Sequence, residues 1–205
     1  VSDETRLYTN AKKNITILNG IPQKEVQDFA SRNIFTIVAV GRLAPVKGFD
    51  LLISALSKVD FDFELQIIGE GEQREELLKL IISLGLQNRI KLVGFVKNVQ
   101  DYIYNSDLQV ISSREEGLSL ALIEGIFYAN VLIATDIANH KQLLGESLVF
   151  DCHVDALVAK LNDLHTNYDK YRSFFAIVKA TKENYTIDKM AQQYLEGYKS
   201  LLVLV

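Results

Sequence analysis

The stretch Leu65-Gln66-Ile67-Ile68-Gly69-Glu70-Gly71 joins a short apolar run to a pair of glycines, and residues 73–84 continue it with a helical pattern. A short apolar run that ends in turn residues is typical of a buried strand. A buried strand, a glycine turn and a helix together form the repeating unit of a parallel sheet. This stretch therefore predicts an α/β fold.

The same alternation recurs on both sides of this stretch. Strands are predicted at residues 35–40, 64–68, 90–93, 108–111, 131–134 and 148–150. Helices are predicted between them, at residues 49–58, 73–84, 99–104, 118–128, 139–144 and 155–165. About six strands with intervening helices indicate a Rossmann-like, doubly wound parallel sheet, whose ligands bind beyond the carboxyl ends of the strands.

The pattern also suggests how the chain is divided. Residues 1–33 are expected to be an incoming interdomain segment with a short strand or extended piece at 15–19, and residues 34–166 to form the Rossmann-like domain. Residues 167–205 contain only helical patterns, at 168–184 and 187–202, which we expect to close the domain. The final apolar residues 201–205 are too few to span a bilayer. They predict the end of an amphipathic helix that packs against another protein surface.

The composition excludes several classes of function. The chain has 205 residues, 48% of them hydrophobic and 23% charged, with a net charge of −4, which does not suit a nucleic-acid partner. The single cysteine, Cys152, excludes an intrachain disulfide and favours a cytoplasmic location. Cys152 and the adjacent His153 are too few to form a structural metal site. No metal site is therefore expected.

Two carboxylates mark the candidate site. Between Gly117 and Phe127 every residue except Ser119, Glu124 and the glycines is apolar. A helix that is apolar all round is buried, and an ionised glutamate within it is costly without a partner. Glu124 is therefore expected to bind a ligand, although a carboxylate tied to a neighbouring backbone amide would also fit. Glu116 precedes it by eight positions, so the two backbones lie roughly 12 Å apart if the segment is helical.

Two cations follow the first predicted strand. Arg42 and Lys47 flank a loop that contains Pro45 and ends at Gly48, before the first predicted helix. Cations beside the free N–H groups of a helix N-terminus form a site for a diphosphate. A pair of solvated loop cations would give the same pattern, and the spacing alone does not separate these interpretations.

Two glycines and a serine are also candidates for the predicted site, because their backbone groups could approach a ligand. Gly69 and Gly71 lack the third glycine of a dinucleotide-binding loop, since Arg74 stands there, so they predict a tight turn near a nucleotide or a turn without a ligand. Ser119 is expected at the N-terminus of the buried helix, as its N-cap, where a phosphate would also be favoured. The Asp60-x-Asp62 pair precedes a predicted strand and is expected to be a solvated turn away from the ligand side.

These elements, taken in order, resemble a known family. Gly41-Arg42-Leu43, Lys47-Gly48, residues 65–71, Ser106-Asp107 with Ser112, and finally Glu116-x7-Glu124 are similar to the ordered motifs of retaining glycosyltransferases of the GT-B type. The resemblance is to family 4, the glycosyl transferases group 1, and covers roughly residues 14–165. It implies that the chain is the C-terminal, donor-binding half of an enzyme that transfers a sugar to a glycan or glycolipid.

The resemblance also implies roles for particular residues. Arg42 and Lys47 would hold the donor diphosphate, Glu116 would contact the transferred sugar, and Glu124 would bind the ribose hydroxyls. Glu116, Arg42 and Lys47 are the expected catalytic residues. The residues expected to bind the donor are Gly41, Arg42, Lys47, Gly69, Gly71, Glu116, Gly117, Leu118, Ser119, Leu120 and Glu124.

The resemblance implies partners as well. The donor would be a UDP- or GDP-linked sugar, and a missing N-terminal domain would bring a glycan or lipid-linked acceptor. Neither a cofactor nor a nucleic acid is expected. Glycan biosynthesis in the cytoplasm, with peripheral association of the whole enzyme at the inner face of the membrane, is the expected setting.

Some residues depart from the family pattern and leave other functions open. Ala129-Asn130-Val131 replaces a Gly-Pro ending, Ala138-Asn139 replaces a Gly-Gly pair, and Gln142 replaces a glutamate. One alternative is a UDP-sugar 2-epimerase-like enzyme, for which His140 is the nearby acid/base candidate. Another is a non-catalytic nucleotide-binding domain, although Arg42, Lys47 and Glu124 are all retained.

Overall fold

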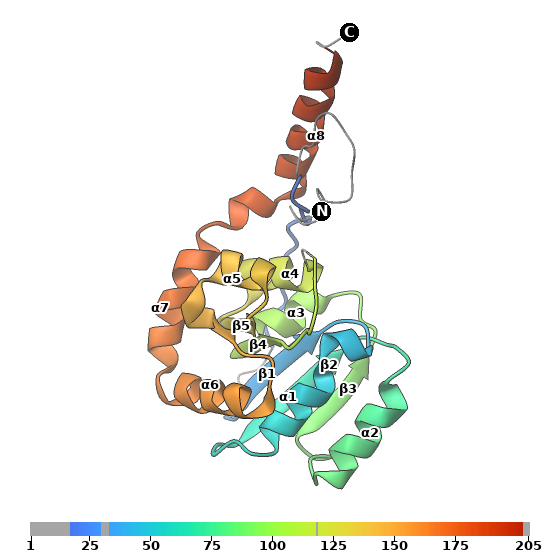
Figure 1. The fold of residues 1–205 in the computed structure, drawn as a ribbon, viewed down its shortest axis with the longest axis vertical. Coiled ribbons are helices and arrows are strands. Elements are labelled where there is room, and N and C mark those ends of the chain that lie inside the picture. The colour runs from blue at the N-terminus through green and yellow to red at the C-terminus, as the bar shows by residue number, and fades with distance from the viewer. Residues whose placement is uncertain (1–16, 30–32, 118, 203–205) are drawn as a thin grey trace.

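The computed structural model describes residues 17–29, 33–117 and 119–202, and their strands form one parallel sheet (Figure 1). The strands are β1 (Phe35–Val40), β2 (Phe63–Ile68), β3 (Ile90–Gly94), β4 (Leu108–Ile111), β5 (Leu132–Thr135) and β6 (Val149–Phe150). Their order is β3-β2-β1-β4-β5-β6, with every pairing parallel. The predicted Rossmann-like fold is confirmed. Its strand order reverses between β1 and β4, where such sheets bind ligands.

Two groups of helices flank the sheet. The helices are α1 (Phe49–Leu56), α2 (Arg74–Ser83), α3 (Val99–Tyr104), α4 (Leu120–Tyr128), α5 (Ala138–Leu144) and α6 (Val154–Thr166). α1 packs against α2 and α6, whereas α3 packs against α4 on the opposite face (Figure 1). β4 and β5 are accordingly buried along their whole length, and the edge strand β3 exposes Lys91. This pattern follows from a sheet that is covered on both faces and open only at its edges.

The core is continuous across the middle of the sheet. Ile37 of β1 lies beside Leu65 of β2 on one side and Leu108 of β4 on the other, and all three are buried. After α6, the helix α7 (Tyr168–Lys179) adds Tyr171 and Phe175 to the same core. The predicted closure of the domain by a C-terminal helix is therefore confirmed for α7.

One predicted helix has other bounds than expected, and one predicted segment forms no strand where the structure describes it. The helix expected at 168–184 ends at Lys179, and a separate 3-10 helix, η4 (Lys182–Tyr185), follows it, because Tyr185 turns into the core. In the short strand or extended piece expected at 15–19, residues 17–19 form no strand, and the other two residues lie outside the described residues. The chain instead pairs further on, where Ile21 forms a parallel bridge with Thr186.

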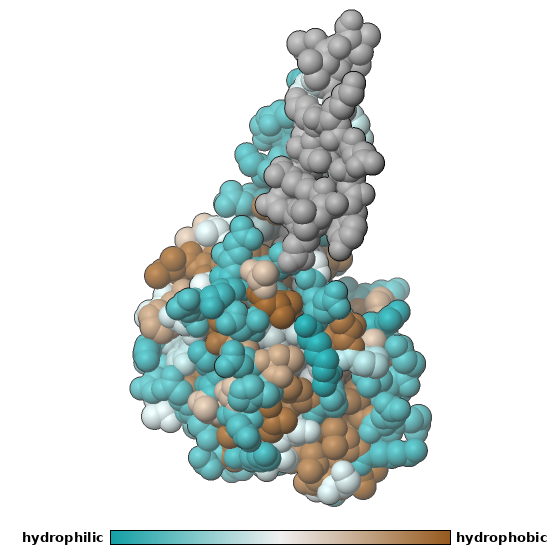
Figure 2. Space-filling model, viewed as in Figure 1, coloured by the Kyte–Doolittle hydropathy of each residue, from teal (hydrophilic) through white to brown (hydrophobic). Residues whose placement is uncertain are grey.

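The last helix, α8 (Ile187–Leu202), extends away from the body of the domain (Figure 1). It leaves large side chains exposed, including Ile187, Tyr194, Leu195 and Tyr198. Hydrophilic residues predominate on its visible part and are mixed with apolar ones on the domain below (Figure 2). In the part of the chain that the structure describes, no helix has both the length and the apolar character needed to cross a membrane.

Candidate functional site

A cleft of about 780 Å³ lies at the carboxyl ends of β1 and β2, beside the N-terminus of α4. Loops that follow the strands supply most of its wall, as the sequence predicts for a doubly wound sheet. The residues that line it are Lys24, Val40, Gly41, Arg42, Lys47, Ile68, Gly69, Glu70, Phe95, Val96, Lys97, Val99, Glu116, Ser119, Leu120, Ala121 and Glu124. The fold therefore brings together most of the predicted site residues.

Two of the predicted binding residues lie outside the cleft wall, and a third is not among the described residues. Gly71 does not line the cleft: a Cβ atom there would lie 2.3 Å from the Leu43 carbonyl oxygen, so this glycine serves the packing of two loops against each other. Gly117 also lies outside the cleft wall. Leu118 falls outside the described residues.

The two cations stand in different surroundings. The Arg42 side chain is 71% exposed and lies 3.9 Å from Glu72, an ion pair of the kind that contributes about 0–1 kcal/mol. Lys47 is largely buried, with its side chain 22% exposed, and its ammonium donates a hydrogen bond to the Glu116 carboxylate. Arg42 is therefore weakly held, and Lys47 is firmly paired with Glu116.

Glu116 is held by both its side chain and its backbone. The Ser113 hydroxyl donates to Glu116 Oε1 at 2.8 Å, beside the bond from Lys47. Asn139 Nδ2 donates to the Glu116 backbone carbonyl at 2.9 Å. The asparagine that replaces a family glycine thus fixes the loop after β4.

The helix α4 is not buried all round, so that expectation was wrong. Leu120 is 55% exposed and forms the cleft wall together with Ala121 and Glu124, while Ile123 and Ile126 on the opposite side are fully buried. Within the part of the chain that the structure describes, this face of α4 borders the cleft and is not packed against another helix or strand, and the sequence pattern alone could not reveal that. Ser119 is the N-cap residue, as predicted, but its side chain makes no capping hydrogen bond.

Burial raises the pKa of the Glu124 carboxyl above its ordinary value, and the charge of Lys24 offsets part of this effect. Within residues 17–29, 33–117 and 119–202, no hydrogen bond or ion pair reaches this carboxylate. An acceptor that is partly desolvated and faces a cleft is a candidate for binding hydroxyl groups. The alternative of a carboxylate tied to a backbone amide finds no such amide in this part of the chain.

Replacement of Glu124 by glutamine is expected to stabilise the unliganded protein at about pH 7.5 and to have little effect at about pH 4. The pKa is raised in the folded state, so the ionised carboxylate destabilises the fold above that pKa, and this penalty is absent below the unfolded value. Urea unfolding of both proteins at the two pH values measures the effect. A variant that is equally destabilised at both would contradict the assignment.

His140 does not reach the cleft. It is fully buried, and burial lowers its pKa below the ordinary value, so that the imidazole is neutral near pH 7. Its Nδ1 lies 3.1 Å from the Thr135 carbonyl oxygen. His140 supports the end of β5 from behind the loop that carries Glu116.

The sequence interpretation missed part of the cleft wall. Phe95, which is 76% exposed, stands at the rim with Val96 and Lys97 after β3. Lys24 comes from the segment before β1, whose backbone is fastened by a hydrogen bond from Lys24 N–H to the Tyr128 hydroxyl at 2.9 Å. The sequence pattern predicts the strand that ends just before Phe95, but it does not predict that the ring of Phe95 is exposed. No local sequence signal predicts that Lys24 lies beside α4.

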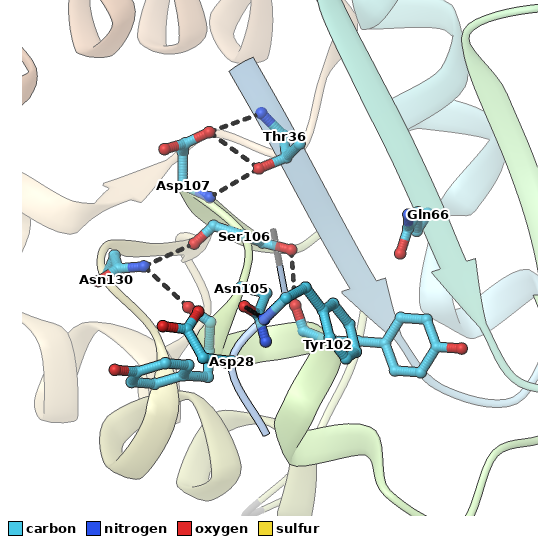
Figure 3. Close-up of a pocket in the computed structure, with 10 residues that line it drawn as sticks. Asp28, Thr36, Gln66, Tyr102, Asn105, Ser106, Asp107 and Asn130 are labelled. Carbon is cyan, nitrogen blue, oxygen red and sulfur yellow. Dashed lines mark hydrogen bonds between the residues drawn. The ribbon is translucent and has the colours of Figure 1, made fainter. Parts of the chain in front are cut away.

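A second hollow, of about 400 Å³, lies near the amino end of β1 (Figure 3). Several of its polar groups are paired: Asp107 accepts hydrogen bonds from the backbone and hydroxyl of Thr36, and Asn130 donates to the Ser106 carbonyl (Figure 3). Asn105 also accepts a hydrogen bond from the Phe29 N–H at 2.6 Å. The residues around this hollow join the incoming segment to the domain. Among the described residues, they do not combine cations and carboxylates as the first cleft does.

The sequence patterns that could suggest a metal site, Asp60-x-Asp62 and Cys152-His153, include residues with structural roles. Asp60 pairs with Asn162, and Asp62 forms an ion pair with Arg89, so both lie in the predicted solvated turn on the amino side of the sheet. His153 Nδ1 accepts a hydrogen bond from the Ala156 N–H and caps α6. Among the described residues, no three histidine, cysteine or acidic side chains are grouped as they would be around a metal ion.

Comparison with known proteins assigns the domain. Residues 34–167 match the family model of the glycosyl transferases group 1. A relative from Campylobacter jejuni, named N-acetylgalactosamine-N,N'-diacetylbacillosaminyl-diphospho-undecaprenol 4-alpha-N-acetylgalactosaminyltransferase, is 37% identical over 119 residues. That alignment covers 58% of this chain and 32% of the relative.

Solved structures with the same fold include two with bound UDP. TarM from S. aureus has a TM-score of 0.81 at 20% identity, over 96% of this chain and 42% of TarM. HepE from Anabaena has a TM-score of 0.75 at 21% identity, over 82% of this chain and 49% of HepE. The chain thus spans half or less of the length of these proteins. It belongs to the family of the glycosyl transferases group 1, and its sheet is a Rossmann-like domain of the GT-B type.

Proposed function

We propose that this chain is the donor-binding domain of a retaining glycosyltransferase of family 4 and that its cleft binds a nucleoside diphosphate sugar. The observation that carries the proposal is the convergence of Arg42, Lys47, Glu116 and Glu124 on one cleft. These residues come from two loops and a helix at the point where the strand order reverses. The cleft combines cations, helix N–H groups that have no partner inside the helix, and carboxylates. This combination suits a ligand that has phosphates between two sets of hydroxyls.

The ligand is proposed to lie along the cleft with its diphosphate between Arg42, Lys47 and the N-terminus of α4. The first N–H groups of a helix have no partner inside the helix and favour an anion. Glu124, one turn further on, would accept hydrogen bonds from the ribose hydroxyls. The base would lie toward Phe95, whose exposed ring offers a surface for stacking.

Glu116 and Lys47 would act at the bond that breaks. As the donor loses its sugar, negative charge develops on the leaving diphosphate, and Lys47, Arg42 and the helix N-terminus would stabilise it. Lys47 would exchange its bond to Glu116 for one to the phosphate, which leaves Glu116 free to orient the sugar. This chemistry is mainly positional and electrostatic, and no side chain in the cleft is assigned as a nucleophile.

The whole enzyme is proposed to act in the synthesis of a polysaccharide or another cell-surface glycan. A second domain would bring the glycan or lipid-linked acceptor to the open side of the cleft. The Campylobacter relative, whose name includes an undecaprenol-linked acceptor, supports a lipid-linked substrate and peripheral action at the membrane. The UDP in the HepE and TarM structures supports a UDP-linked donor over a GDP-linked one.

Calorimetric titration of this chain with UDP, GDP and ADP, and with their sugar derivatives, tests the proposal. One nucleoside diphosphate is expected to bind, weakly, because only one wall of the full cleft is present. If none of them binds at millimolar concentration, the assignment of the site is wrong.

The two alternatives differ from the proposed function in what they require of the site. A UDP-sugar 2-epimerase-like enzyme would need an acid/base group within reach of the sugar, and His140 is buried behind the loop instead. A nucleotide-binding domain that has lost catalysis would bind the diphosphate as tightly as the sugar nucleotide and would gain no transfer when joined to its second half.

Glu124→Gln is expected to reduce the preference of the site for ribonucleotides over deoxyribonucleotides, while the fold stays intact. The amide fills the same space and still accepts a hydrogen bond, but it loses the charge-assisted bonds to the two hydroxyls, each worth about 1.5–3 kcal/mol. Titration with UDP and dUDP measures the ratio of affinities. An unchanged ratio would show that Glu124 does not contact the ribose.

A further inference from the structure

Arg114 lies in the loop after β4, two residues before Glu116, and it is not among the residues that line the cleft. Its side chain points instead to the loop after β1, which carries Lys47. Since the two loops supply the proposed phosphate-binding and sugar-binding groups, the contacts between them determine how those groups are placed.

Several hydrogen bonds join the two loops. The Arg114 backbone N–H donates to the Val46 carbonyl at 2.7 Å, and its Nη1 donates to the Pro45 carbonyl at 2.5 Å. The Ser112 hydroxyl donates to the Lys47 carbonyl at 2.9 Å. Three consecutive carbonyl groups before Gly48 are thus held by residues of the other loop.

Arg114 also binds the helix that follows Lys47. Both terminal nitrogens of its guanidinium donate to the Asp50 carboxylate, at 2.9 and 2.7 Å. Burial alone would raise the pKa of Asp50, but the hydrogen bonds and charge of Arg114 lower it below the ordinary value. A two-pronged bond of this kind fixes orientation as well as distance, which a lysine could not do.

The loop after β1 and the loop after β4 are also in direct backbone contact, at Gly48 and Ser112. Gly48 has a φ of 62°, and a Cβ atom there would lie 2.1 Å from the Ser112 carbonyl oxygen. Only glycine allows this contact without displacement of one loop. The segment from Pro45 to Asp50 and the segment from Ser112 to Glu116 therefore form one rigid unit.

We propose that Arg114 and Asp50 are positioning residues of the donor site, which hold Lys47 in register with Glu116. The proposal rests on the proposed function, because it assigns these loops to one donor molecule. Arg114 is not part of the cleft wall, and it acts through the backbone of Pro45 and Val46 before Lys47 and through the Asp50 carboxylate after it. Its loss would let the ammonium of Lys47 drift from the diphosphate, while the rest of the cleft stays in place.

The test is the affinity for UDP and GDP of the variants Arg114→Ala, Arg114→Lys and Asp50→Asn, measured by calorimetry. Each is expected to bind the diphosphate about 3- to 30-fold more weakly, the range for groups that act through a network, and to bind the corresponding nucleoside as before. The control is Arg172→Ala, which removes an exposed arginine paired with Asp169 at 3.7 Å on α7 and is expected to change nothing.

A double-mutant cycle separates positioning from general support of the fold. If Arg114 acts through Lys47, Arg114→Ala is expected to cost almost nothing in a Lys47→Ala background. An equal loss in both backgrounds, or a loss that extends to the nucleoside, would overturn the proposal. Unchanged diphosphate affinity in Asp50→Asn and Arg114→Lys would also overturn it. Failure of the unaltered chain to bind any diphosphate would instead refute the proposed function.

Discussion

Lys47→Ala is expected to weaken the binding of UDP or GDP by about 1.5–3 kcal/mol, roughly 10- to 150-fold. The variant loses a charge-assisted hydrogen bond to the phosphate. It also leaves the largely buried Glu116 carboxylate without the cation that it contacts in the unliganded protein. Arg42→Ala is expected to fall near the lower end of the same range, because Arg42 lies at the exposed rim. Calorimetry with the diphosphate and with the nucleoside measures both effects.

The pairing of Lys47 with Glu116 gives this prediction a specific control. In the double variant Lys47→Ala, Glu116→Gln, the unpaired carboxylate is absent, so part of the lost diphosphate affinity is expected to return. Nucleoside binding is expected to stay the same in all of these variants. Equal losses for nucleoside and diphosphate would mean that the substitution disturbs the fold or that Lys47 has another role.

Residues 1–205 alone are expected to bind the donor but to transfer no sugar, and joining them to the proposed upstream acceptor domain is expected to restore transfer. Holding two reactants in the correct geometry accounts for about 7–11 kcal/mol of a catalysed barrier. The described domain supplies one wall of the cleft, and the proposed second domain would bring the acceptor and exclude water. The measurement is transfer from a labelled nucleotide sugar to a lipid-linked glycan acceptor, with the chain alone and with the longer protein.

The helix α8 provides a second measurement in the same experiment. Ile187, Tyr194, Leu195 and Tyr198 are exposed along it, and we propose that the upstream half covers them. Limited proteolysis is expected to cleave α8 in the chain alone and to spare it in the longer protein. Transfer by residues 1–205 alone at the rate of the longer protein would contradict the proposal that this chain is the donor half.

Much of the fold could be predicted from the sequence, because each strand carries its own signal. The apolar runs that became β1 and β4 were predicted with the observed ends, since their central residues are buried, Gly41 follows β1, and the polar residues Asp107 and Ser112 flank β4. The parallel order followed from the alternation of strands and helices. The loops that hold Arg42, Lys47 and Glu116 could then be placed on one edge of the sheet without a structure.

Other features depend on contacts between distant residues and have no local signal. The sequence pattern of α4 predicted complete burial, but whether Leu120 faces protein or a cleft depends on which elements pack beside it. Lys24 reaches the site because the Tyr128 hydroxyl fastens its backbone, across 104 positions of the chain. The helix expected at 168–184 ends early because Tyr185 is buried by residues outside that segment.

The sequence by itself determined the α/β fold, the edge of the sheet that carries the cleft, and eight of the seventeen residues that line that cleft. The periodicity of apolar residues and the spacing of motif residues depend only on the order of residues, so they can be recognised in the sequence. Only the tertiary structure decided that Lys47 is paired with Glu116, that Gly71 supports a loop, and that Arg114 joins the two loops. A hydrogen bond or a backbone contact depends on positions in space, which the packing of the whole domain sets.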